Sequence, residues 1–407
     1  MSVAETVSPP SAGVGHGTEL ILSIGRGKEY DVHVPPTSLT IRHIQQQIPT
    51  KYFKRSFWRS FAYLVRDLLQ IALTYAAMQL VGLPVANYLS AVAGSASTKE
   101  GRILLSSAAF LYWAVLWTAY WFVQGLNGTA LWVLAHECGH QAFSTSRTIN
   151  NTVGYLLHTV LLVPYHSWRI THGTHHKHTN HLTKDLVFVP TQRNAVCEAM
   201  EEAPLVMLAN MLIMFVFGWP AHLVANAGGQ NLGRFASHFD PSAPFFRRED
   251  YRDVVVSDVG IVAMLAAIGC FSWNFGFLNL CSWYLVPYLW VNFWLVYITY
   301  MQHSDVRLPH YTNEHWTFVR GALAAVDRDF GGVLNTWLHH INDSHIVHHL
   351  FSQMPHYNAI QVTRKHIREI LGNLYVSSDK PLIKSLLHTW QECRYVVPDE
   401  GICVYRR

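Results

Sequence analysis

Long apolar runs without a charged residue alternate with polar, histidine-rich segments along this chain. Four stretches contain no Asp, Glu, Lys or Arg: residues 68–98, 103–136, 203–233 and 259–304. A helix needs about 20 apolar residues to cross the hydrocarbon core of a bilayer. The first stretch predicts one span at 68–83, and the second predicts one at 104–123. The fourth is long enough for two, at 254–273 and 277–301. We expect Pro84 to end the first span.

The third stretch is a weaker span, because residues 203–223 include two prolines and a histidine. The following segment, 224–257, carries four arginines, so the positive-inside rule places it in the cytosol together with both termini. A full crossing by 203–223 would move this loop to the other side. We therefore predict that 203–223 is a re-entrant or interfacial helix, and that the polar segment 148–168 is also interfacial. The fold class predicted is an all-α integral membrane protein with four spans in two hairpins.

The same pattern divides the chain into three parts. Residues 1–60 form a cytosolic N-terminal tail with an amphipathic segment, 61–374 form the main domain, and 375–407 form a cytosolic C-terminal tail. Within the main domain, a cytosolic helical cap is expected from the segments between and after the spans, at 134–200, 224–252 and 302–374.

Composition agrees with a membrane protein. Only 14% of the 407 residues are charged and 50% are apolar, whereas soluble domains average about 25% charged residues. These values exclude a disordered chain, a coiled coil and an ordinary soluble enzyme. The net charge of +4 is small and no dense basic stretch points to nucleic acid. The six cysteines form no CxxC pair, so reduced thiols are expected.

Histidine is the unusual residue, with 25 copies. Eight of them form three boxes: HECGH with His136 and His140, HGTHH with His172, His175 and His176, and HIVHH with His345, His348 and His349. Spacings of three and four residues place the rings of each box on one face of a helix. Three such clusters of buried core histidines would be costly, because buried imidazoles need partners.

The boxes point to a pair of metal ions. HECGH alone matches the zinc-protease pattern HExxH, but a catalytic zinc takes about three protein ligands. Eight histidines suit two metals. Imidazole binds Zn, Cu, Fe and Ni alike, and the Glu-x-x-His repeats of ferritin-like di-iron bundles are absent from the sequence. Neutral nitrogen ligands beside a bilayer favour a redox metal pair that acts on a lipid-soluble substrate.

Several longer motifs resemble the membrane fatty acid desaturases, and most closely the plant and fungal oleate (delta-12) and omega-3 acyl-lipid enzymes. They are AHECGHQAFS (135–144), DLVFVP (185–190), TYMQH (299–303), DRDFG (327–331) and SHIVHHLFSQMPHYNA (344–359). The resemblance covers about residues 40–374. It implies that the eight box histidines bind two iron ions, that dioxygen is the co-substrate, and that the enzyme desaturates a C18 acyl chain in the endoplasmic reticulum membrane. It also implies cytochrome b5 and its reductase as separate electron donors, because the sequence has no HPGG haem motif.

The resemblance implies a ninth ligand at the cytosolic end of the last span. His303 occupies this place, and His340 is the alternative. Glu137, Asp185 and Asp343 are candidates to accept hydrogen bonds from the ligand imidazoles, since metal-bound histidines usually donate their second N–H to a carboxylate or carbonyl. Asp343 could equally cap the helix of the third box.

Four functions remain open on the sequence alone. The first is oleate desaturation to a diene, an oxidoreductase activity. The second, within the same superfamily, is omega-3 desaturation or a divergent hydroxylase, epoxygenase or acetylenase. The third is an intramembrane zinc protease that uses His136, Glu137 and His140. The fourth is a transporter or metal store, which is disfavoured because the boxes lie at the ends of the spans.

Overall fold

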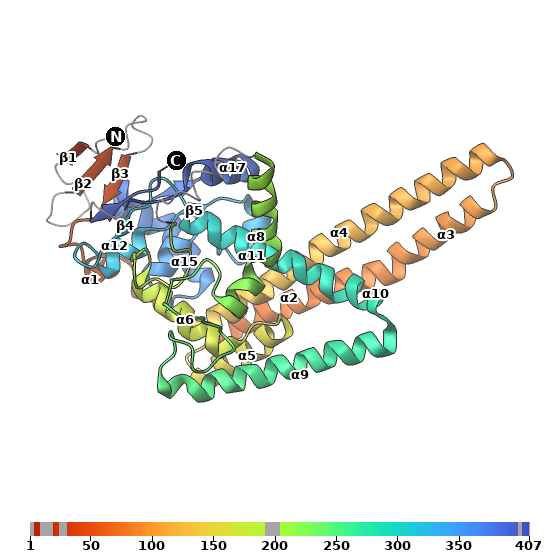
Figure 1. Cartoon of the computed structure of the whole chain (residues 1–407), viewed down its shortest axis with the longest axis horizontal. Helices are drawn as coiled ribbons and strands as arrows, with labels where there is room; N and C mark the ends of the chain where they lie inside the picture. Colours follow the sequence, from red (N-terminus) through yellow and green to blue (C-terminus); the bar gives the residue numbers. More distant parts are fainter. Residues whose placement is uncertain (1–3, 9–18, 24–30, 192–203, 398–400, 407) are drawn as a thin grey trace.

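The computed structural model describes residues 4–8, 19–23, 31–191, 204–397 and 401–406. Parts of the expected N-terminal tail, the stretch 192–200 of the expected cap and parts of the expected C-terminal tail lie outside these residues. The described chain is mostly helical, with long helices that extend away from a compact body containing both ends of the chain (Figure 1).

Two helical arms pack along each other and extend furthest from the body (Figure 1). The first arm runs through α2 (Phe57–Ala77), the π-helical segment η3 (Met78–Gly82) and α3 (Leu83–Gly94). The second is α4 (Lys99–Gly139). Side chains cap both arms, because the hydroxyls of Ser56 and Thr98 accept hydrogen bonds from backbone N–H groups of the first helical turns. The C-terminal end of α4 is buried in the body.

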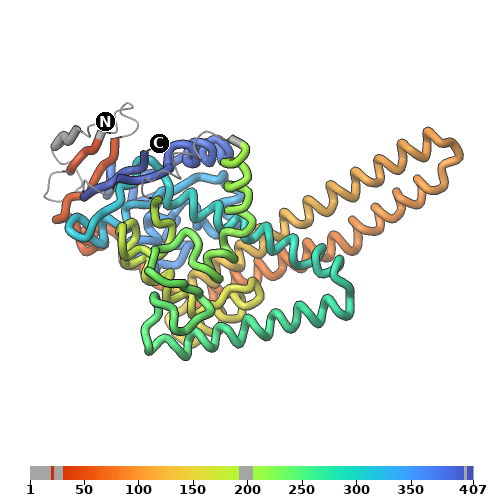
Figure 2. The backbone as a smooth tube through the Cα atoms, viewed as in Figure 1, coloured from red at the N-terminus to blue at the C-terminus, as the bar shows by residue number. Residues whose placement is uncertain are grey.

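A second pair of arms begins with α9 (Tyr251–Phe275), which turns at Gly276. The chain returns through α10 (Phe277–Leu280), η5 (Cys281–Leu285) and α11 (Val286–His303), whose last turns are buried against α4 (Figure 2). Gly276 has a φ of 88°, in the left-handed region that glycine adopts without strain.

Prolines reshape two of the expected spans without ending them. We expected Pro84 to end the first span, and this prediction is wrong. The helix continues to Gly94, because the π-helical segment η3 precedes the proline. In η3 the Leu83 N–H binds the carbonyl of Met78, one residue further back than in an α-helix. Pro287 is likewise preceded by a π-helical segment, η5. A proline has no N–H to donate and clashes with the preceding turn, and a wider turn relieves both problems.

Four helices among the described residues are long and apolar enough to cross a membrane: Phe57–Gly94, Lys99–Gly139, Leu205–Ala225 and Arg248–Phe275. The number equals the number predicted, but the members differ. The expected span 277–301 is divided among three helical segments and is not among the four. Residues 204–223 instead lie in one uninterrupted helix, α8 (Pro204–Ala225), which lies across the direction of α9 (Figure 1), and residue 203 lies outside the described residues. A re-entrant segment enters the membrane and turns back, so its helix would be interrupted at the turn. The helix α8 is continuous.

Short helices build the body around the buried ends of α4 and α11. They are α1 (Ile41–Gln46), η2 (Thr50–Phe53), α5 (Arg147–Val160), α6 (Tyr165–His178), η4 (Arg248–Asp250), α12 (Phe318–Leu323), α13 (Gly332–Trp337), α14 (His345–Leu350), α15 (His356–Val362), η6 (Thr363–Ile367), α16 (Arg368–Leu371), η7 (Gly372–Leu374) and α17 (Leu382–Glu392). The largest core cluster joins α4, α6, α8 and α11 through buried aromatic and aliphatic side chains, including Trp132, Trp168, Phe215, Trp294 and Met301.

Small β-sheets correct the expectation of an all-α protein. An antiparallel sheet has the order β1 (Ala4–Ser8), β2 (Glu19–Ser23), β3 (Asp31–Val34). Two two-stranded sheets pair β4 (His310–Tyr311) with β7 (Ile402–Cys403) and β5 (Asp327–Arg328) with β6 (Ser377–Ser378). Strands of two residues carry no detectable period in the sequence.

We expected a tail after residue 374. The described residues there pack onto the body instead. Strands β6 and β7 pair with strands of the main domain, and α17 buries Leu386 in the largest core cluster. The Tyr297 hydroxyl on α11 donates a hydrogen bond to the carbonyl of Leu382 at 3.0 Å. The C-terminal residues therefore support the helix that ends at His303.

Candidate metal centre

Four elements bring nine histidines together. Box one lies at the buried end of α4, box two at the end of α6 and box three in α14, while His303 is the last residue of α11. The nitrogens that could bind metal form two groups. Within 4.8 Å of one another lie those of His136, His140, His172, His176 and His348, and separately those of His175, His303 and His349. The ninth ring, His345, joins the second group through contacts with His303 and His349.

The close contacts between rings are those that a shared ion would create. The Nε2 atom of His136 lies 2.9 Å from Nε2 of His172 and 3.2 Å from Nε2 of His140. In the second group, Nε2 of His345 lies 3.0 Å from Nε2 of both His303 and His349. A single imidazole nitrogen has either one proton or one lone pair, so hydrogen bonding satisfies only one of its two contacts. Nitrogens about 2.1 Å from one ion and at right angles lie about 3 Å apart.

The protonation state of the rings also suits metal binding. Burial, with a further contribution from the neighbouring imidazoles, lowers the pKa of His172, His176, His348 and His349 well below its ordinary value. The pKa of His140 falls to about 3 for the same main reason. A neutral ring presents a lone pair to a metal. Both nitrogens of His176 and the Nε2 of His348 are buried without a hydrogen bond, and an ion would supply the partner of one nitrogen of each ring.

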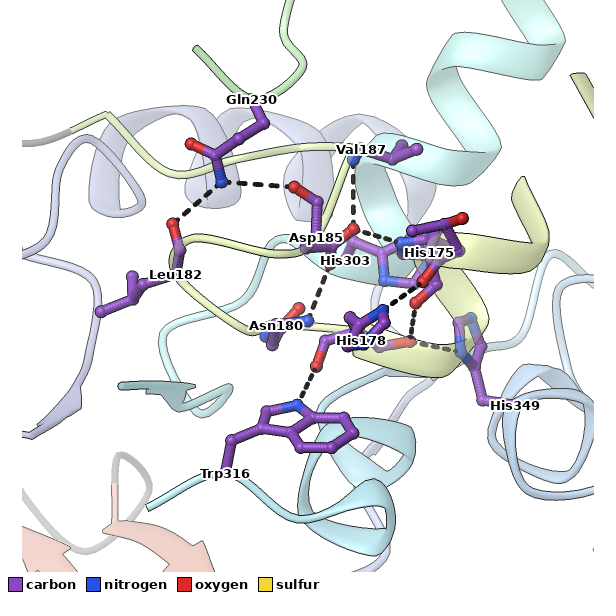
Figure 3. Close-up of polar contacts among 12 residues, drawn as sticks. His175, His178, Asn180, Leu182, Asp185, Val187, Gln230, His303, Trp316 and His349 are labelled. Carbon is purple, nitrogen blue, oxygen red and sulfur yellow. Dashed lines mark hydrogen bonds and ion pairs between the residues drawn. The ribbon is translucent and has the colours of Figure 1, made fainter. Parts of the chain in front are cut away.

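Among the three expected carboxylates, Asp185 contacts a box histidine, His175. Its Oδ1 atom lies 2.7 Å from His175 Nδ1, and its carboxylate also accepts hydrogen bonds from the backbone N–H groups of Asn180 and Val187 (Figure 3). A carboxylate only accepts, so Nδ1 of His175 carries the proton and Nε2 is left for the metal. Gln230 supports this loop by donating to the carbonyls of Leu182 and Asp185 (Figure 3).

Thr179 gives His349 the same support, which the sequence analysis missed. Its hydroxyl donates to the carbonyl of His175 at 2.9 Å and lies 3.1 Å from Nδ1 of His349. The Trp316 indole N–H donates to the Thr179 carbonyl at 3.0 Å (Figure 3). One hydroxyl thus joins box two to box three. No signal in the sequence marks a lone threonine for this role.

The other two expected carboxylates contact different histidines. Glu137 accepts hydrogen bonds from the backbone N–H and the Nδ1 of His356, at 3.0 and 3.2 Å. Asp343 lies 3.0 Å from Nδ1 of His340 and pairs with Arg364, so His340 belongs to this partly exposed group and to neither metal group. The α14 helix has no side-chain cap from its Ser344.

Asp327 and Arg328, in the DRDFG motif, position two of the ligand-bearing segments. Asp327 accepts a hydrogen bond from the backbone N–H of Ile346 at 2.8 Å, at the start of α14, and from the Tyr375 hydroxyl at 2.7 Å. Burial raises the pKa of Asp327 to about 6. The buried guanidinium of Arg328 donates to the carbonyls of Met301 and Ser304, on either side of His303. The sequence resemblance included this motif but assigned it no role.

An apolar cavity of about 690 Å³ reaches both histidine groups. Its wall includes His136 and His172 of the first group and His175, His303 and His345 of the second. The rest is largely aromatic and aliphatic, from α4, α6, α8, α11 and the end of α17. Trp168 stacks on His172 at 4.6 Å between ring centroids, and Trp132 stacks on His136 at 5.4 Å. The arrangement can hold an apolar chain beside two metal ions.

Comparison with known proteins agrees with this geometry. The sequence model described as "Fatty acid desaturase" matches residues 113–380. A Delta(12) fatty acid desaturase of Mortierella alpina is 42% identical over 387 residues, 90% of each chain. A Delta(12)-fatty-acid desaturase of Arabidopsis thaliana is 39% identical over 90% of this chain and 89% of its own. The omega-6 fatty acid desaturase, endoplasmic reticulum isozyme 1, of Glycine max is 38% identical over 92% of both chains. This chain therefore belongs to the fatty acid desaturase family of oxidoreductases.

Proposed function

We propose that this protein is a delta-12 acyl-lipid desaturase, which converts a monounsaturated C18 chain such as oleate to the diene linoleate. The observation that carries the proposal is the apolar cavity that meets both histidine groups. The names of the fungal and plant relatives support the position of the new double bond.

We propose two iron ions as the resident metals, held by His136, His140, His172, His176 and His348 in one group and by His175, His303, His345 and His349 in the other. When bound, the iron pair supplies dioxygen activation and removal of hydrogen from an unactivated methylene, which no protein side chain can perform. Burial favours the neutral form of His140, His172, His176, His348 and His349. Asp185 orients His175, and Thr179 orients His349. Separate cytochrome b5 and its reductase would supply two electrons per dioxygen reduced to water.

The cavity would hold the acyl chain and exclude water. The residues of α8 and α11 in its wall are largely apolar. Trp132 and Trp168 stack on ligand histidines and restrict the space beside the metals. An existing cis bond would fix where along the cavity a chain bends, and so which methylenes lie beside the metals. The C18 chain would be carried by a phospholipid or by coenzyme A.

We also propose the membrane arrangement. The arms α2–α4 and α9–α11 would be the two hairpins, with the histidine-bearing body and both termini in the cytosol. The arginines of 224–257 support this side. The isozyme name of the soybean relative supports the endoplasmic reticulum membrane.

Expression in a yeast that lacks polyunsaturated fatty acids tests the function directly. Gas chromatography of its lipids should show a new C18 diene with bonds at positions 9 and 12, and the purified protein should contain about two iron ions per chain. Expression of a membrane-bound, iron-loaded protein without any new diene would reject the proposal. A triene or an oxygenated chain would instead identify omega-3 desaturation or a hydroxylase, epoxygenase or acetylenase.

The zinc-protease alternative has little support from the structure. In that mechanism Glu137 would face the metal as general base, yet its carboxylate is 3% exposed and binds His356. A protease of this type would tolerate His175→Ala and His348→Ala. The proposed desaturase would lose activity with either change.

A further inference from the structure

Two buried histidines outside the metal centre are each paired with a carboxylate. The Nε2 atom of His339 lies 2.6 Å from Oδ2 of Asp67, and both side chains are 0% exposed. The Nδ1 atom of His356 lies 3.2 Å from Oε2 of Glu137, with both side chains at most 5% exposed. Carboxylates only accept hydrogen bonds, so each imidazole donates through the nitrogen named.

The two pairs form one cluster, which we define as Asp67, His339, His356, Glu137 and the tyrosine between them, Tyr63. The rings of His339 and His356 lie 4.7 Å apart. The Tyr63 ring packs edge-on against both, at 5.5 and 4.6 Å. The chain would not bury two carboxylates together unless donors satisfied them, because an unpaired buried charge is strongly destabilising.

The cluster joins the first histidine box to both flanks of the third. Glu137 lies on α4 between His136 and His140, and Asp67 lies on α2. His339 precedes α14, which carries the third box, and His356 begins α15, which follows it. The contact between Glu137 and His356 spans 219 residues of sequence. The Glu137–His356 pair therefore ties box three directly to box one, and the Asp67–His339 pair ties it to α2, which packs along α4.

The backbone at His339 shows that this position is constrained. His339 and the next residue, His340, have φ values of 55° and 59°, in the left-handed region that residues with a side chain rarely adopt. Two such residues in sequence persist only where surrounding contacts determine the conformation. The Asp67 carboxylate, which also binds the guanidinium of Arg66, is such a contact.

We propose that His339 and His356 are positioning residues for the metal centre: through Asp67 and Glu137 they hold box three in place against box one. The inference rests on the proposed function, because it assumes that these boxes share metal ions. Neither histidine contacts the metal-binding nitrogens of the two groups. Their effect would act through α4, α14 and α15.

The two histidines donate through different nitrogens, and this difference gives a crossed test. An asparagine amide nitrogen is as many bonds from Cβ as imidazole Nδ1, and a glutamine amide nitrogen is as many as Nε2. His356→Asn should therefore preserve metal binding, and His356→Gln should lose it. His339→Gln should preserve it, and His339→Asn should lose it. Loss of an outer contact of this kind weakens metal affinity about 10- to 100-fold.

The measurements are the metal content of the purified protein, the rate at which a chelator removes the metal at a temperature well below unfolding, and the unfolding temperature of the metal-free protein. A histidine with no role in the cluster, His366, packs against Tyr52 and serves as the control. His366→Asn and His366→Gln should leave the extraction rate unchanged. A merely structural role would lower the unfolding temperature of the failing variants without increasing that rate.

The crossed pattern in metal extraction supports the proposal. Equal behaviour of Asn and Gln at both positions, whether both retain metal or both lose it, would overturn it. The outcome is separable from the proposed function: a crossed pattern in a protein that forms no diene leaves the cluster in place and rejects the desaturase, whereas diene formation without the pattern rejects the cluster.

Discussion

An imidazole has two ring nitrogens. When one of them hydrogen-bonds to a neighbouring side chain, the other is left to bind the metal. Asp185 fixes this choice for His175, and Thr179 fixes it for His349. Both contacts come from the segment that directly follows α6, so one short stretch orients ligands of two boxes. The quality of this outer layer of contacts should decide how tightly the metals are held.

Replacing Asp185 by asparagine tests this layer. Both carboxylate oxygens of Asp185 accept hydrogen bonds, from His175 and from the backbone N–H groups of Asn180 and Val187. In Asp185→Asn, an NH₂ group replaces one of these oxygens. It would face a donor and could not accept its hydrogen bond. We expect metal affinity to fall about 10- to 100-fold, measured as iron per chain after dialysis against a chelator. Asp343→Asn is the control, since the Asp343 carboxylate pairs with His340 and Arg364 and, among the described residues, with no histidine of the two metal groups. Equal iron retention by the two variants would contradict this role of Asp185.

Buried histidines outside the centre should make the protein sensitive to acid. Burial lowers the pKa of His310 to about 3, while an unfolded histidine titrates near pH 6.5. Above about pH 6.5 the ring is neutral in both states, and below it only the unfolded chain takes up a proton. Stability should therefore fall as pH drops from about 6.5 toward 3, by about 1.4 kcal/mol per pH unit for each such residue.

His310→Phe checks this dependence, because it keeps a ring against Tyr405, 4.9 Å away between centroids. The unfolding temperature of the variant, measured between pH 7.5 and 5, should fall less steeply than that of the parent protein. Comparison with the parent cancels the other titrating groups. Parallel curves for the two proteins would show that His310 titrates alike in the folded and unfolded states.

At the residue scale, sequence spacing identified the eight box histidines, and the resemblance pointed to His303. The structure brings all nine together. The partner of Glu137 could not be predicted from the sequence. Glu137 contacts His356, which is 219 residues away, and a contact between such distant residues leaves no local sequence pattern. Asp185 was predictable because it follows box two closely, at a separation of 10 residues from His175.

Among the helices, the length of an apolar run predicted which segments are helical better than where they end. Pro84 was a signal of a helix end, but a π-helical segment before it accommodates it, and Pro287, inside the expected span 277–301, is accommodated in the same way. Whether a proline ends a helix depends on what packs around it, which the sequence does not show. The wider turn also changes the phase of the side chains that follow, so α11 reaches His303 with a rotation that a regular helix would lack.

Close packing of α4 and α11 should be essential, because these helices carry His136 and His303. A Cβ at Gly125 of α4 would lie 2.2 Å from Cβ of Trp290 on α11, an atom that moves only with the backbone. We expect Gly125→Ala to destabilise the protein by about 1–3 kcal/mol and to reduce iron content, measured by thermal unfolding and metal analysis. Gly269→Ala on α9 is the control, since no atom lies within 4 Å of its added Cβ. An unchanged unfolding temperature for Gly125→Ala would show that the two helices can separate without cost.

On the scale of the whole molecule, residues far apart in sequence complete the site. The C-terminal residues, expected as a tail, pair with the main domain through two short sheets and place α17 against the core. Arg328 links this helix to the end of α11, donating to Ser385 at 2.6 Å. Such contacts depend on the final arrangement of the chain, so neither composition nor periodicity predicted them.

The cavity between α8 and α11 gives a way to separate acyl binding from metal binding. Gly218 on α8 lines the cavity, and a Cβ there would make ordinary contacts, 3.5 Å from Met214 and 3.8 Å from Val296. Gly218→Ala should therefore preserve diene formation. Gly218→Phe would place a ring in the cavity, and we expect C18 diene formation to fall at least tenfold while iron content stays near that of the parent. Gas chromatography and metal analysis of the same preparation measure both. Undiminished diene formation by the Phe variant would mean that the acyl chain does not pass Gly218 and reaches the metals by another path.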